Sequence, residues 1–349
     1  MKQYQIKNIS SGATFTVNEG ESVLNAALRQ GVMLPYSCKN GTCGSCKGHL
    51  ESGEVHYPFH PPLALSREEI GEGRALFCQA EPTGDLVIRA REIEAVRDIH
   101  VRKMPARVTG KTLLAPDVMC IKIKLPNAQR LQFLAGQYLE ILLPEGKRRA
   151  FSIASSPQSE DEIELHIRHV DGGGFTGWVF DELIERDILC LDAPLGSLFL
   201  RNDRLERPMI LMGGGTGFAP LKSMLEDLLA QNDKRPLHLF WGAGNRADLY
   251  MHDQARLWAE QHEHIKYSTA LMDPSDAEAS GSFNGFVHQA VLEHYADLSG
   301  FDIYMSGPPA MIDASRSAFL ENGAEKRRIF FDSFEFGLDV PIRVLAKSH

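Results

Sequence analysis

The stretch Cys38-Lys-Asn-Gly-Thr-Cys43-Gly-Ser-Cys46 decides how the first part of this 349-residue chain folds. Its three cysteines are spaced C-x4-C-x2-C, and a fourth cysteine, Cys78, follows far downstream in Leu76-Phe77-Cys78. This is the spacing of the four thiolates that hold a plant-type [2Fe–2S] cluster. We therefore expect Cys38, Cys43, Cys46 and Cys78 to bind such a cluster, which carries one electron at a time.

The residues between the cysteines suit a loop that wraps closely around a cluster. Gly41 and Gly44 let the backbone approach sulfur without an intervening Cβ atom, and Asn40-Gly41 is a turn dipeptide. A zinc site or two disulfides are the alternatives. Zinc sites usually pair short C-x2-4-C knuckles, of which the chain has one. No secretory signal precedes the cysteines, which disfavours disulfides.

Composition bounds the class of protein. The length predicts two or three domains, and 43% hydrophobic with 24% charged residues is ordinary for a globular protein. A net charge of −9 disfavours nucleic acid as a partner. No apolar run reaches about 18 residues, so no membrane span is expected, and a reducing cytoplasm suits free thiols. Cys120 and Cys190 lie in apolar, strand-like runs and are expected to be buried small hydrophobic residues.

Residues 1–92 form the first of three blocks. They combine a strand pair, a helix with apolar residues at helical spacing, the cysteine loop and two further short strands. The expected elements are strands at 3–9, 13–17, 47–51 and 85–89 and a helix at 22–30, which Gly31 ends. Elements in this order predict a small ferredoxin domain of the β-grasp kind.

Two more blocks follow a charged linker at 93–104. Residues 105–203 carry period-2 apolar alternation in runs separated by turns, which predicts an antiparallel β-barrel. Residues 204–349 alternate apolar strands with helical stretches, which predicts a parallel α/β sheet. The clearest expected elements are strands at 118–125, 138–143 and 163–170 in the barrel, strands at 209–212, 237–241 and 301–305 in the sheet, and a helix at 221–229.

A glycine-rich loop, Gly213-Gly-Gly-Thr-Gly-Phe-Ala-Pro220, stands between an expected strand and helix of the last block. Glycines let backbone N–H groups approach a phosphate at the start of a helix, and Pro220 suits the first helical turn. The loop differs from the G-x-G-x-x-G of a Rossmann fingerprint, and glycine also serves ordinary strand–helix turns. Its position between strand and helix predicts a phosphate cradle.

Three motifs resemble those of the ferredoxin–NADP reductase family and follow the family order. They are Arg149-Ala-Phe-Ser152, Gly215-Thr-Gly-Phe-Ala-Pro220 and Ser306-Gly-Pro-Pro309. With the cysteine block in front, the whole chain is similar to the single-chain reductases of bacterial multicomponent oxygenases, and equally to the CDP-6-deoxy-glucoseen reductase of dideoxysugar synthesis. The resemblance implies a ferredoxin domain, an FAD-binding barrel and an NAD(P)-binding domain, with a [2Fe–2S] cluster, FAD and NADH or NADPH as cofactors.

The resemblance also implies residue roles at the flavin. Arg149 would pair with the FAD pyrophosphate, for which a guanidinium fork is well suited. Phe151 would pack against the isoalloxazine ring, where the family usually has tyrosine, and Ser152 would lie near flavin N5. The N–H groups and hydroxyl of a short glycine segment would hold the pyrophosphate, although an ordinary glycine turn has the same pattern. The residues of that segment are Gly173, Gly174 and Thr176.

At the nicotinamide, Ser306 stands where relatives often carry cysteine, and serine makes a more polar contact of similar size. Phe334 would cover the flavin face, whereas Phe330 and Phe331 are equally well explained as core residues of the last strand. Ser152, Ser306 and Phe334 are thus the expected catalytic residues. The remaining residues expected to bind the nucleotide are Gly214, Gly215, Thr216, Gly217, Pro220, Arg246, Gly307 and Pro308.

The choice between NADH and NADPH rests on the segment Trp241-Gly-Ala-Gly-Asn-Arg246. An acidic residue there would bond a ribose 2′-OH, but none occurs before Asp248. Arg246 could accept a 2′-phosphate or be solvated, and the resemblance favours NADH. His262 and His264 lie in a polar stretch expected to be helical; they lack a third metal ligand and are expected to be solvated.

The resemblance implies that electrons pass from NAD(P)H through FAD and the cluster to a partner protein that docks near the Cys38–Cys46 loop. Two acceptors stay open: a terminal oxygenase of the Rieske or di-iron type, and a pyridoxamine-dependent CDP-sugar 3-dehydrase. A non-catalytic redox-sensing or zinc-binding module is a third alternative, but it leaves the flavin and nucleotide motifs unexplained.

Overall fold

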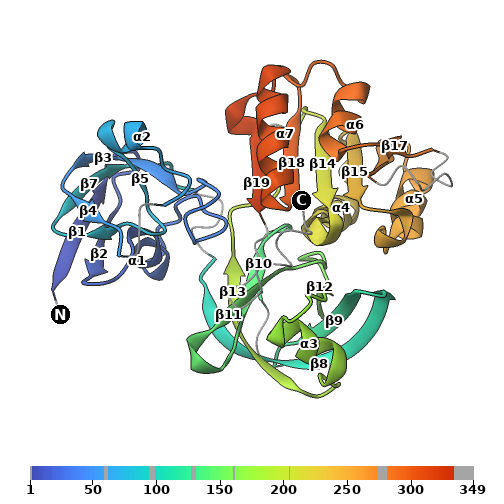
Figure 1. The fold of residues 1–349 in the computed structure, drawn as a ribbon, viewed down its shortest axis with the longest axis horizontal. Coiled ribbons are helices and arrows are strands. Elements are labelled where there is room, and N and C mark those ends of the chain that lie inside the picture. Colours follow the sequence, from blue (N-terminus) through green and yellow to red (C-terminus); the bar gives the residue numbers. More distant parts are fainter. Residues whose placement is uncertain are drawn as a thin grey trace. The chain divides into compact units, whose positions relative to one another are not determined.

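The computed structural model describes residues 2–58, 62–93, 99–126, 131–159, 162–203, 205–272 and 281–333. The chain separates into two compact units, Met1–Arg102 and Lys103–His349. Both are drawn in Figure 1, and each is described by itself below. Residues 94–98 of the expected linker, and Phe334, lie outside the described residues.

The first unit contains a five-stranded sheet of order β2-β1-β7-β3-β5 and a helix that follows its first hairpin. Strand β1 pairs in parallel with β7, and the other pairs in this sheet are antiparallel. A parallel pair between the first and last strands, with the helix between them in sequence, is the predicted β-grasp arrangement. The elements are β1 (Gln3–Asn8), β2 (Thr14–Asn18), α1 (Val23–Arg29), β3 (Lys47–Ser52), β4 (Val55–His56), α2 (Arg67–Gly71), β5 (Arg74–Leu76), β6 (Glu81–Pro82) and β7 (Leu86–Arg89).

Helix α1 begins and ends as its sequence predicts. The Ser22 hydroxyl accepts a hydrogen bond from the Asn25 N–H at 3.3 Å, which satisfies one free donor of the first turn. Gly31 follows the helix with φ +77°, a left-handed conformation that glycine adopts without strain. The Leu24 N–H donates to the Phe77 carbonyl at 2.9 Å. The helix is therefore bonded to the segment that carries Cys78.

The second unit begins with a six-stranded barrel of order β11-β10-β13-β8-β9-β12. Its end strands meet through a bridge between Ile153 and Leu165 and a hydrogen bond from the Ala154 N–H to the Glu164 carbonyl at 2.8 Å. This contact closes the sheet on itself, which is how small barrels remove open edges. The elements are β8 (Arg102–Ala115), β9 (Val118–Lys124), β10 (Tyr138–Leu142), β11 (Arg148–Ser152), β12 (Ile163–Arg168), α3 (Gly174–Asp181) and β13 (Ile188–Leu195), with a 3-10 turn at Pro144–Gly146.

A six-stranded parallel sheet of order β17-β16-β15-β14-β18-β19 completes the second unit. Alternate residues of β14 face opposite sides: Met209 and Leu211 pack under α4 and α5, and Ile210 and Met212 pack under α6 and α7. Helices thus cover both faces, as Figure 1 shows. The elements are β14 (Met209–Gly214), α4 (Phe218–Ala230), β15 (Leu237–Ala243), α5 (His252–Gln261), β16 (Ile265–Leu271), β17 (Phe283–Asn284), α6 (Val287–His294), β18 (Asp302–Gly307), α7 (Pro309–Glu321) and β19 (Ile329–Ser333), with 3-10 turns at Gly215–Gly217, Arg246–Asp248 and Lys326–Arg328.

The strand order of this sheet reverses at β14. Strands β15, β16 and β17 follow one another on one side of β14, and β18 and β19 lie on the other. In open α/β sheets, ligands bind beyond the carboxyl ends of the strands at such a reversal. The glycine loop after β14 and Ser306 near the end of β18 occupy that position. The predicted fold class, a ferredoxin domain, an antiparallel barrel and a parallel α/β sheet, is confirmed.

Two expectations about local environment are wrong. Cys120 is buried as expected, but Cys190 is exposed, because on β13 it alternates with the buried Leu189 and Leu191 and therefore faces outward. Its apolar neighbours did not reveal which side of the strand faces the core. His262 and His264 do not lie on a helix, because α5 ends at Gln261. Among the described residues, no helix is both long and apolar enough to cross a membrane.

Candidate functional site

The structure brings the four predicted cluster cysteines together. Cys38, Cys43 and Cys46 lie in the loop between α1 and β3, and Cys78 follows β5. Their sulfurs contact one another in two pairs, Cys38 with Cys43 and Cys46 with Cys78. Cys46 and Cys78 are buried, whereas Cys38 and Cys43 are partly exposed. Two thiolates for each of two irons is the ligand arrangement of a [2Fe–2S] cluster, so the quartet fits this group.

Electrostatics within the quartet favour a bound cation. The backbone N–H groups of Cys43 and Ser45 donate to the sulfurs of Cys38 and Cys43 at 3.4 and 3.5 Å. A hydrogen bond from the Cys43 thiol lowers the pKa of Cys38 to about 5. The pKa values of Cys43 and Cys78 are raised, because each donates its proton to the neighbouring sulfur and is largely buried. Further ionisation is therefore costly until iron supplies positive charge.

Glycine is required where the cysteine loop turns. Gly41 has φ +88°, and a Cβ atom there would lie 2.9 Å from the Cβ of Pro62. The Gln79 side-chain amide donates to the Lys39 carbonyl at 2.7 Å. This bond ties the loop to the residue after Cys78, so the two distant parts of the ligand set are held together before any metal binds.

The expected flavin residues lie on β11, which pairs with β10. The Ser152 side chain is buried, and its hydroxyl has no hydrogen-bond partner among the described residues. Such a group costs free energy unless a ligand satisfies it, so it fits a flavin nitrogen at this place. Phe151 is half-buried and packs on Phe175 of α3 with ring centroids 5.6 Å apart. The half-buried Arg149 donates to the Arg148 carbonyl at 2.8 Å.

The segment from Gly173 to Thr176 forms the start of helix α3. A Cβ atom on Gly174 would meet nothing within 4 Å, so the first turn is open to a ligand. Free N–H groups at the start of a helix suit a phosphate. The Thr176 hydroxyl accepts a hydrogen bond from the Val170 N–H at 3.1 Å and lies 3.3 Å from the Gly173 carbonyl. Because this hydroxyl is engaged in the turn, the N–H groups are the better phosphate donors.

The glycine loop and Ser306 meet at the carboxyl ends of β14 and β18. A Cβ atom on Gly217 would lie 2.0 Å from the Ser306 carbonyl oxygen, so glycine alone permits this approach. The Ser306 side chain is 0% exposed, and its hydroxyl has no hydrogen-bond partner within the described part of the chain. Gly215 has φ +54°, and its carbonyl accepts a bond from Trp241 Nε1 at 3.0 Å. A buried polar atom beside a glycine loop that leads into a helix fits a nicotinamide nucleotide.

The other residues expected at the nucleotide surround this contact. Met311 of α7 packs against Gly214, since a Cβ atom on Gly214 would lie 2.6 Å from its sulfur. The expected residues take these places: Gly214 ends β14, Thr216 lies in the 3-10 turn, Pro220 lies in the first turn of α4, Gly307 ends β18 with φ +156°, and Pro308 precedes α7.

Arg168, the last residue of β12, is a candidate site residue that the sequence analysis did not single out. A Cβ atom on Gly215 would lie 3.6 Å from its Nη1. Its Nε lies 3.3 Å from the Asp117 carboxylate, while Nη2 is buried and has no hydrogen-bond partner among the described residues. A guanidinium with a free N–H beside a glycine loop suits a phosphate. Its position shortly before the Gly173 segment is the feature of the sequence that could have identified it. Its contact with Gly215 arises only from tertiary packing.

Arg246 and Asp248 make local bonds after β15. The Asp248 carboxylate accepts a bond from the Asn245 N–H at 3.2 Å, and the Asn245 side chain accepts one from the Asp248 N–H at 3.3 Å. Arg246 Nη2 lies 2.9 Å from Nε2 of His252, whose pKa is lowered by burial and then by the charge of Arg246. The Asp248 carboxylate therefore stabilises its own turn by a hydrogen bond from the Asn245 N–H, and the Arg246 guanidinium has His252 Nε2 as an acceptor.

The aromatic residues of β19 serve the core. Phe330 is buried, and the Arg201 guanidinium lies 4.8 Å from its ring centroid. Phe331 is half-buried and packs against the core under α6 and α7. Phe334 lies outside the described residues, so its expected position over the flavin stays a prediction.

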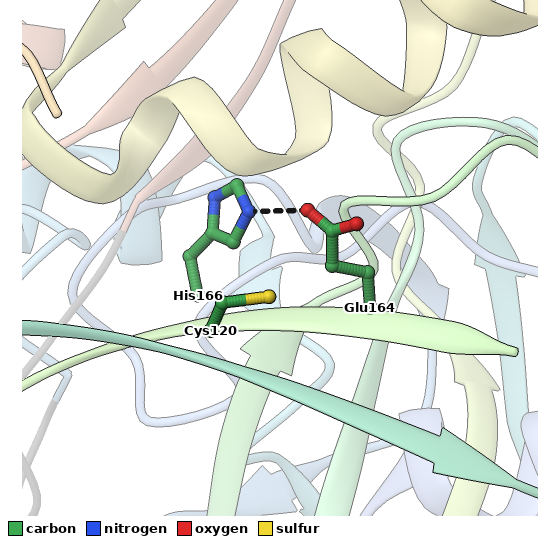
Figure 2. A group of neighbouring side chains, drawn as sticks. All are labelled: Cys120, Glu164 and His166. Carbon is green, nitrogen blue, oxygen red and sulfur yellow. Dashed lines mark hydrogen bonds and ion pairs between the residues drawn. The ribbon is translucent and has the colours of Figure 1, made fainter. Parts of the chain in front are cut away.

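Cys120, Glu164 and His166 bring side chains of metal-ligand type together outside the predicted sites (Figure 2). Their ligand atoms lie within 4.8 Å of one another. His166 Nε2 bonds the Glu164 carboxylate at 2.7 Å, and its Nδ1 lies 3.0 Å from the Tyr250 hydroxyl. The Lys222 ammonium lies 3.3 Å from the same carboxylate. Both imidazole nitrogens are thus engaged, and a cation already neutralises Glu164.

Burial and charge set the protonation of this cluster. Burial alone would raise the pKa of Glu164, but the His166 hydrogen bond and the Lys222 charge outweigh it and lower this pKa to about 2. Burial lowers the pKa of His166, although Glu164 opposes the shift. Burial also raises the pKa of Cys120 to about 12. The cluster therefore consists of an ionised carboxylate, a neutral imidazole and a neutral thiol.

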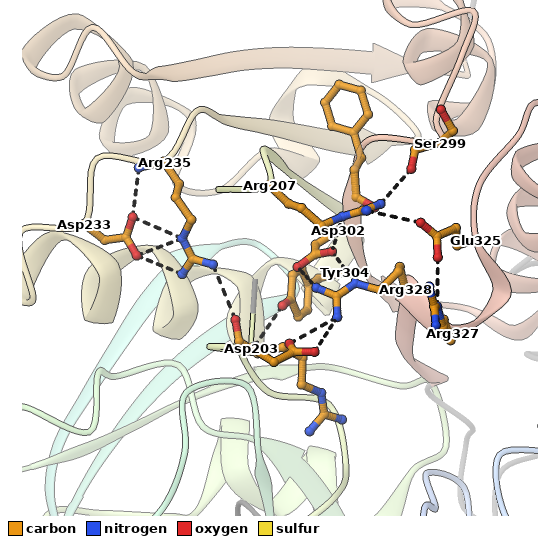
Figure 3. Close-up of polar contacts among 12 residues, drawn as sticks. Asp203, Arg207, Asp233, Arg235, Ser299, Asp302, Tyr304, Glu325, Arg327 and Arg328 are labelled. Carbon is orange, nitrogen blue, oxygen red and sulfur yellow. Dashed lines mark hydrogen bonds and ion pairs between the residues drawn. The ribbon is translucent and has the colours of Figure 1, made fainter. Parts of the chain in front are cut away.

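A second charged cluster is drawn in Figure 3. It surrounds Asp302, the first residue of β18, whereas Ser306 lies near the other end of that strand. The fully buried Asp302 carboxylate bonds Arg328 at 2.6 Å and Arg207 at 3.1 Å. Arg328 also bonds Asp203, in the segment between barrel and sheet, at 2.9 Å. A buried carboxylate between two guanidinium groups has its charge compensated. We interpret this cluster as structural, because it joins the sheet to the segment that enters it.

Comparison with known protein families divides the chain into three matches. Residues 7–83 match the 2Fe-2S iron-sulfur cluster binding domain. Residues 105–199 match the oxidoreductase FAD-binding domain. Residues 211–317 match the oxidoreductase NAD-binding domain. The three families expected from the motifs are present in the expected order.

Similar proteins match over nearly their whole length. The CDP-6-deoxy-L-threo-D-glycero-4-hexulose-3-dehydrase reductase of Yersinia pestis is 37% identical, over 94% of this chain and 98% of its own. The reductase component DmpP of phenol 2-monooxygenase from Pseudomonas sp. (strain CF600) is 37% identical, over 96% of both chains. The crystal structure of the Amycolatopsis cytochrome P450 reductase GcoB covers 95% of this chain and 98% of its own, with 34% identity and a TM-score of 0.79.

Arg149→Ala is expected to weaken FAD binding at least about tenfold, because a charge-assisted bond to phosphate contributes about 1.5–3 kcal/mol. FAD per protein after gel filtration and titration of the apoprotein with FAD measure this. The matched control is Arg148→Ala, since Arg148 pairs with Glu140 and Asp192 instead, and it is expected to retain FAD. Unchanged FAD affinity in Arg149→Ala would contradict the assignment.

His166→Gln is expected to reduce the loss of stability on acidification. The folded-state pKa of His166 lies below its ordinary value of 6.5, so its unfolded form binds more protons just below that pH. The contribution of His166 to the free energy of unfolding is therefore fully present above pH 6.5, and it is lost as the pH falls below that value. Between about pH 7.5 and 5.5, the wild-type unfolding midpoint, followed by flavin fluorescence, should drop more than that of the variant, by about 2–4 °C for each kcal/mol.

The control for this experiment is His262→Gln, because His262 lies in a partly exposed turn after α5. It is expected to keep the wild-type dependence on pH. Equal pH dependence in wild type and His166→Gln would show that His166 takes up its proton in the folded protein as readily as in the unfolded chain.

Proposed function

The chain belongs to the family of single-chain reductases that join a [2Fe–2S] domain to FAD-binding and NAD-binding domains, and we propose that it delivers electrons to a terminal oxygenase. It is an NAD(P)H-dependent oxidoreductase in which electrons pass from NAD(P)H through FAD to the cluster. When bound, the flavin exchanges electron pairs and single electrons, and the cluster carries single electrons at roughly −400 mV.

The residues of the chain bind and orient these groups. The N–H groups at the start of α3 and the Arg149 side chain would hold the FAD pyrophosphate, and the glycine loop would hold the nucleotide phosphates. The Ser152 and Ser306 hydroxyls, both buried without a protein partner among the described residues, would bond the flavin and the nicotinamide. Ser306 is fully buried beside the glycine loop, which excludes water from its hydroxyl.

The observation that carries the oxygenase proposal is the similarity, over nearly the whole chain, to reductase components of oxygenases. Their names assign them to phenol 2-monooxygenase and terephthalate 1,2-dioxygenase. The acceptor would dock at the cluster loop, where Cys38 and Cys43 are partly exposed and Asn40 is exposed. Leu63 lies beside this loop, because the N–H of the next residue, Ala64, donates a hydrogen bond to the Gly41 carbonyl. The Leu63 side chain is 85% exposed.

A CDP-sugar 3-dehydrase that uses pyridoxamine is the second candidate acceptor. The 37% identity to the CDP-6-deoxy-hexulose-3-dehydrase reductase of Yersinia pestis supports it. Both acceptors would take single electrons from the same cluster, so the reductase chemistry is common to the two proposals. The cytoplasm is the proposed location, because thiolate ligation of iron requires cysteines that stay reduced.

NADH is expected to be the better substrate, with kcat/KM about tenfold or more above that for NADPH. The resemblance to the family favours NADH, and the Arg246 guanidinium already has an acceptor within the protein, since its Nη2 lies 2.9 Å from Nε2 of His252. Steady-state assays with ferricyanide measure both values. The Arg246→Ala variant should change kcat/KM for NADH little. A higher value for NADPH that disappears in Arg246→Ala would instead identify Arg246 as a ligand of the 2′-phosphate.

Cys43→Ser is expected to separate the two halves of the electron path. The variant should lose reduction of cytochrome c and of a purified oxygenase component, because both take electrons from the cluster. It should keep NADH-driven reduction of ferricyanide, which can take electrons directly from flavin. The wild type, assayed in parallel with the oxygenase and with the CDP-sugar dehydrase, identifies the acceptor. Cys190→Ser is the control, since Cys190 is exposed on the barrel, outside the quartet.

If Cys43→Ser lost ferricyanide reduction as well as cytochrome c reduction, this would contradict the proposal that the flavin passes electrons to ferricyanide independently of the cluster. Wild-type protein that reduces the CDP-sugar dehydrase and no oxygenase would replace the proposed acceptor with the second candidate.

A further inference from the structure

Helix α4 is bonded to the barrel along a buried seam. The Lys222 ammonium donates to the Ala154 carbonyl at 3.3 Å, and the Ser223 hydroxyl donates to the Ser155 carbonyl at 2.7 Å. Lys222 is 5% exposed and Ser223 is 0% exposed. One turn further along the helix, the Ser156 hydroxyl lies 3.3 Å from the Asp227 carboxylate. We call these contacts the α4 seam; each joins the NAD-binding helix to residues 154–156 of the barrel.

The residues of the α4 seam lie only a few positions from the expected flavin-binding motif on one side and from the glycine loop on the other. Ala154 follows Ser152, the expected flavin contact, by two residues. Lys222 follows Gly217, which touches Ser306, by five residues and lies in the same helix as Pro220. A displacement of α4 at Lys222 would therefore move the glycine loop relative to β11.

An ionic network anchors Lys222 from the other side. Its ammonium lies 3.3 Å from the Glu164 carboxylate of β12 and 2.9 Å from Glu226, one turn along α4. Glu164 in turn bonds His166, which lies 3.0 Å from the Tyr250 hydroxyl. Lys222 thus bonds two parts of the barrel at once, the segment after β11 and strand β12.

The network reaches the glycine loop by a second route. The Tyr250 ring packs edge-on against Trp241 with centroids 5.1 Å apart, and Trp241 donates to the Gly215 carbonyl at 3.0 Å. The Phe218 ring, at the start of α4, stacks on Trp241 at 3.9 Å. Gly215 and Phe218 of the loop are therefore linked, through Trp241 and Tyr250, to the cluster drawn in Figure 2.

A metal ion is a weaker interpretation of this cluster. A cation bound by Cys120, Glu164 and His166 would have to displace the Lys222 ammonium and break the bond between Glu164 and His166. The buried lysine makes the carboxylate unavailable and would repel the ion. The observations therefore favour a positioning role for Lys222.

We propose that Lys222 is a positioning residue for the NAD(P)H-to-FAD reaction, holding the glycine loop and the flavin-binding strand at the separation that hydride transfer requires. The inference rests on the reductase function stated above. Lys222 touches neither cofactor motif directly; it acts through Ala154 and Glu164 on one side and through helix α4 on the other. Misplacement of reacting groups by about 1 Å costs about a hundredfold in rate, so a small shift of α4 has a large effect.

The test compares two variants. Lys222→Met keeps the approximate length of the side chain but removes its charge and its hydrogen-bond donors. Lys222→Arg keeps the positive charge and the donors. In Lys222→Met, kcat for NADH-driven ferricyanide reduction is expected to fall about 10–100-fold, with KM and bound FAD changed less than about threefold. The isotope effect with NADH deuterated at the transferred position should rise. Lys222→Arg should recover most of kcat.

A structural readout accompanies the kinetics. Backbone amides of residues 154–158 should exchange with deuterium faster in Lys222→Met than in wild type, also in protein without nucleotide. The matched control is Arg256→Met on the exposed face of α5, where Arg256 pairs with Glu260 one turn away, as Lys222 does with Glu226. This control should leave kcat, the isotope effect and exchange at 154–158 unchanged.

Folded, FAD-loaded Lys222→Met with kcat and isotope effect within twofold of wild type would overturn the proposal. If Lys222→Met fails to fold, Ser223→Ala decides, because it removes one seam bond without leaving a buried charge. It should raise exchange at 154–158 and lower kcat severalfold; no change in either would equally overturn the proposal. Wild-type protein whose flavin is not reduced by NADH or NADPH would instead refute the reductase function itself.

Discussion

The close approach of Gly217 to the Ser306 carbonyl is the constraint on which the nucleotide half of this protein depends. A Cβ atom at Gly217 would lie 2.0 Å from that oxygen, so the loop after β14 meets β18 only because glycine is there. This contact places the loop at the point where the strand order of the sheet reverses. Helix α4 follows this loop, and its polar side chains find partners in the barrel.

The buried polar groups of the second unit divide into two kinds. Those with partners hold elements together: Asp302 with two arginines at the amino end of β18, and Lys222 with Glu164 and Glu226 at the α4 seam. Breaking such pairs is costly, because the partner left behind is a buried charge. Others lack a hydrogen-bond partner among the described residues, such as Thr109 Oγ1, His288 Nδ1 and the hydroxyls of Ser152 and Ser306, and of these the two serines stand where a cofactor is expected. At these two serines the missing partner coincides with the expected cofactor site, and we interpret the paired groups as those that hold the surrounding elements together.

The division into two compact units follows the chemistry. The flavin and nucleotide motifs share one unit, in which the α4 seam joins the barrel to the parallel sheet. Hydride transfer requires reacting atoms in contact and aligned, which calls for such a rigid connection. The cluster cysteines belong to the other unit, whose own bonds hold the ligand loop: Gln79 to Lys39, and Leu24 to the segment before Cys78. A cluster that serves an external protein can thus be built as a separate module.

The sequence by itself determined the fold class and the order of the three domains and predicted the four cluster ligands, because those depend on local periodicity and on fixed spacings such as C-x4-C-x2-C. It also located the glycine loop and Ser306 as separate motifs. Only the tertiary structure decided that Gly217 and Ser306 touch, that Arg168 reaches Gly215, that Cys190 faces outward and that Lys222 bonds the barrel. Each of these findings depends either on the packing of segments far apart in the chain or on which face of a strand is buried. The spacing of neighbouring residues in the sequence encodes neither the long-range packing nor the buried face.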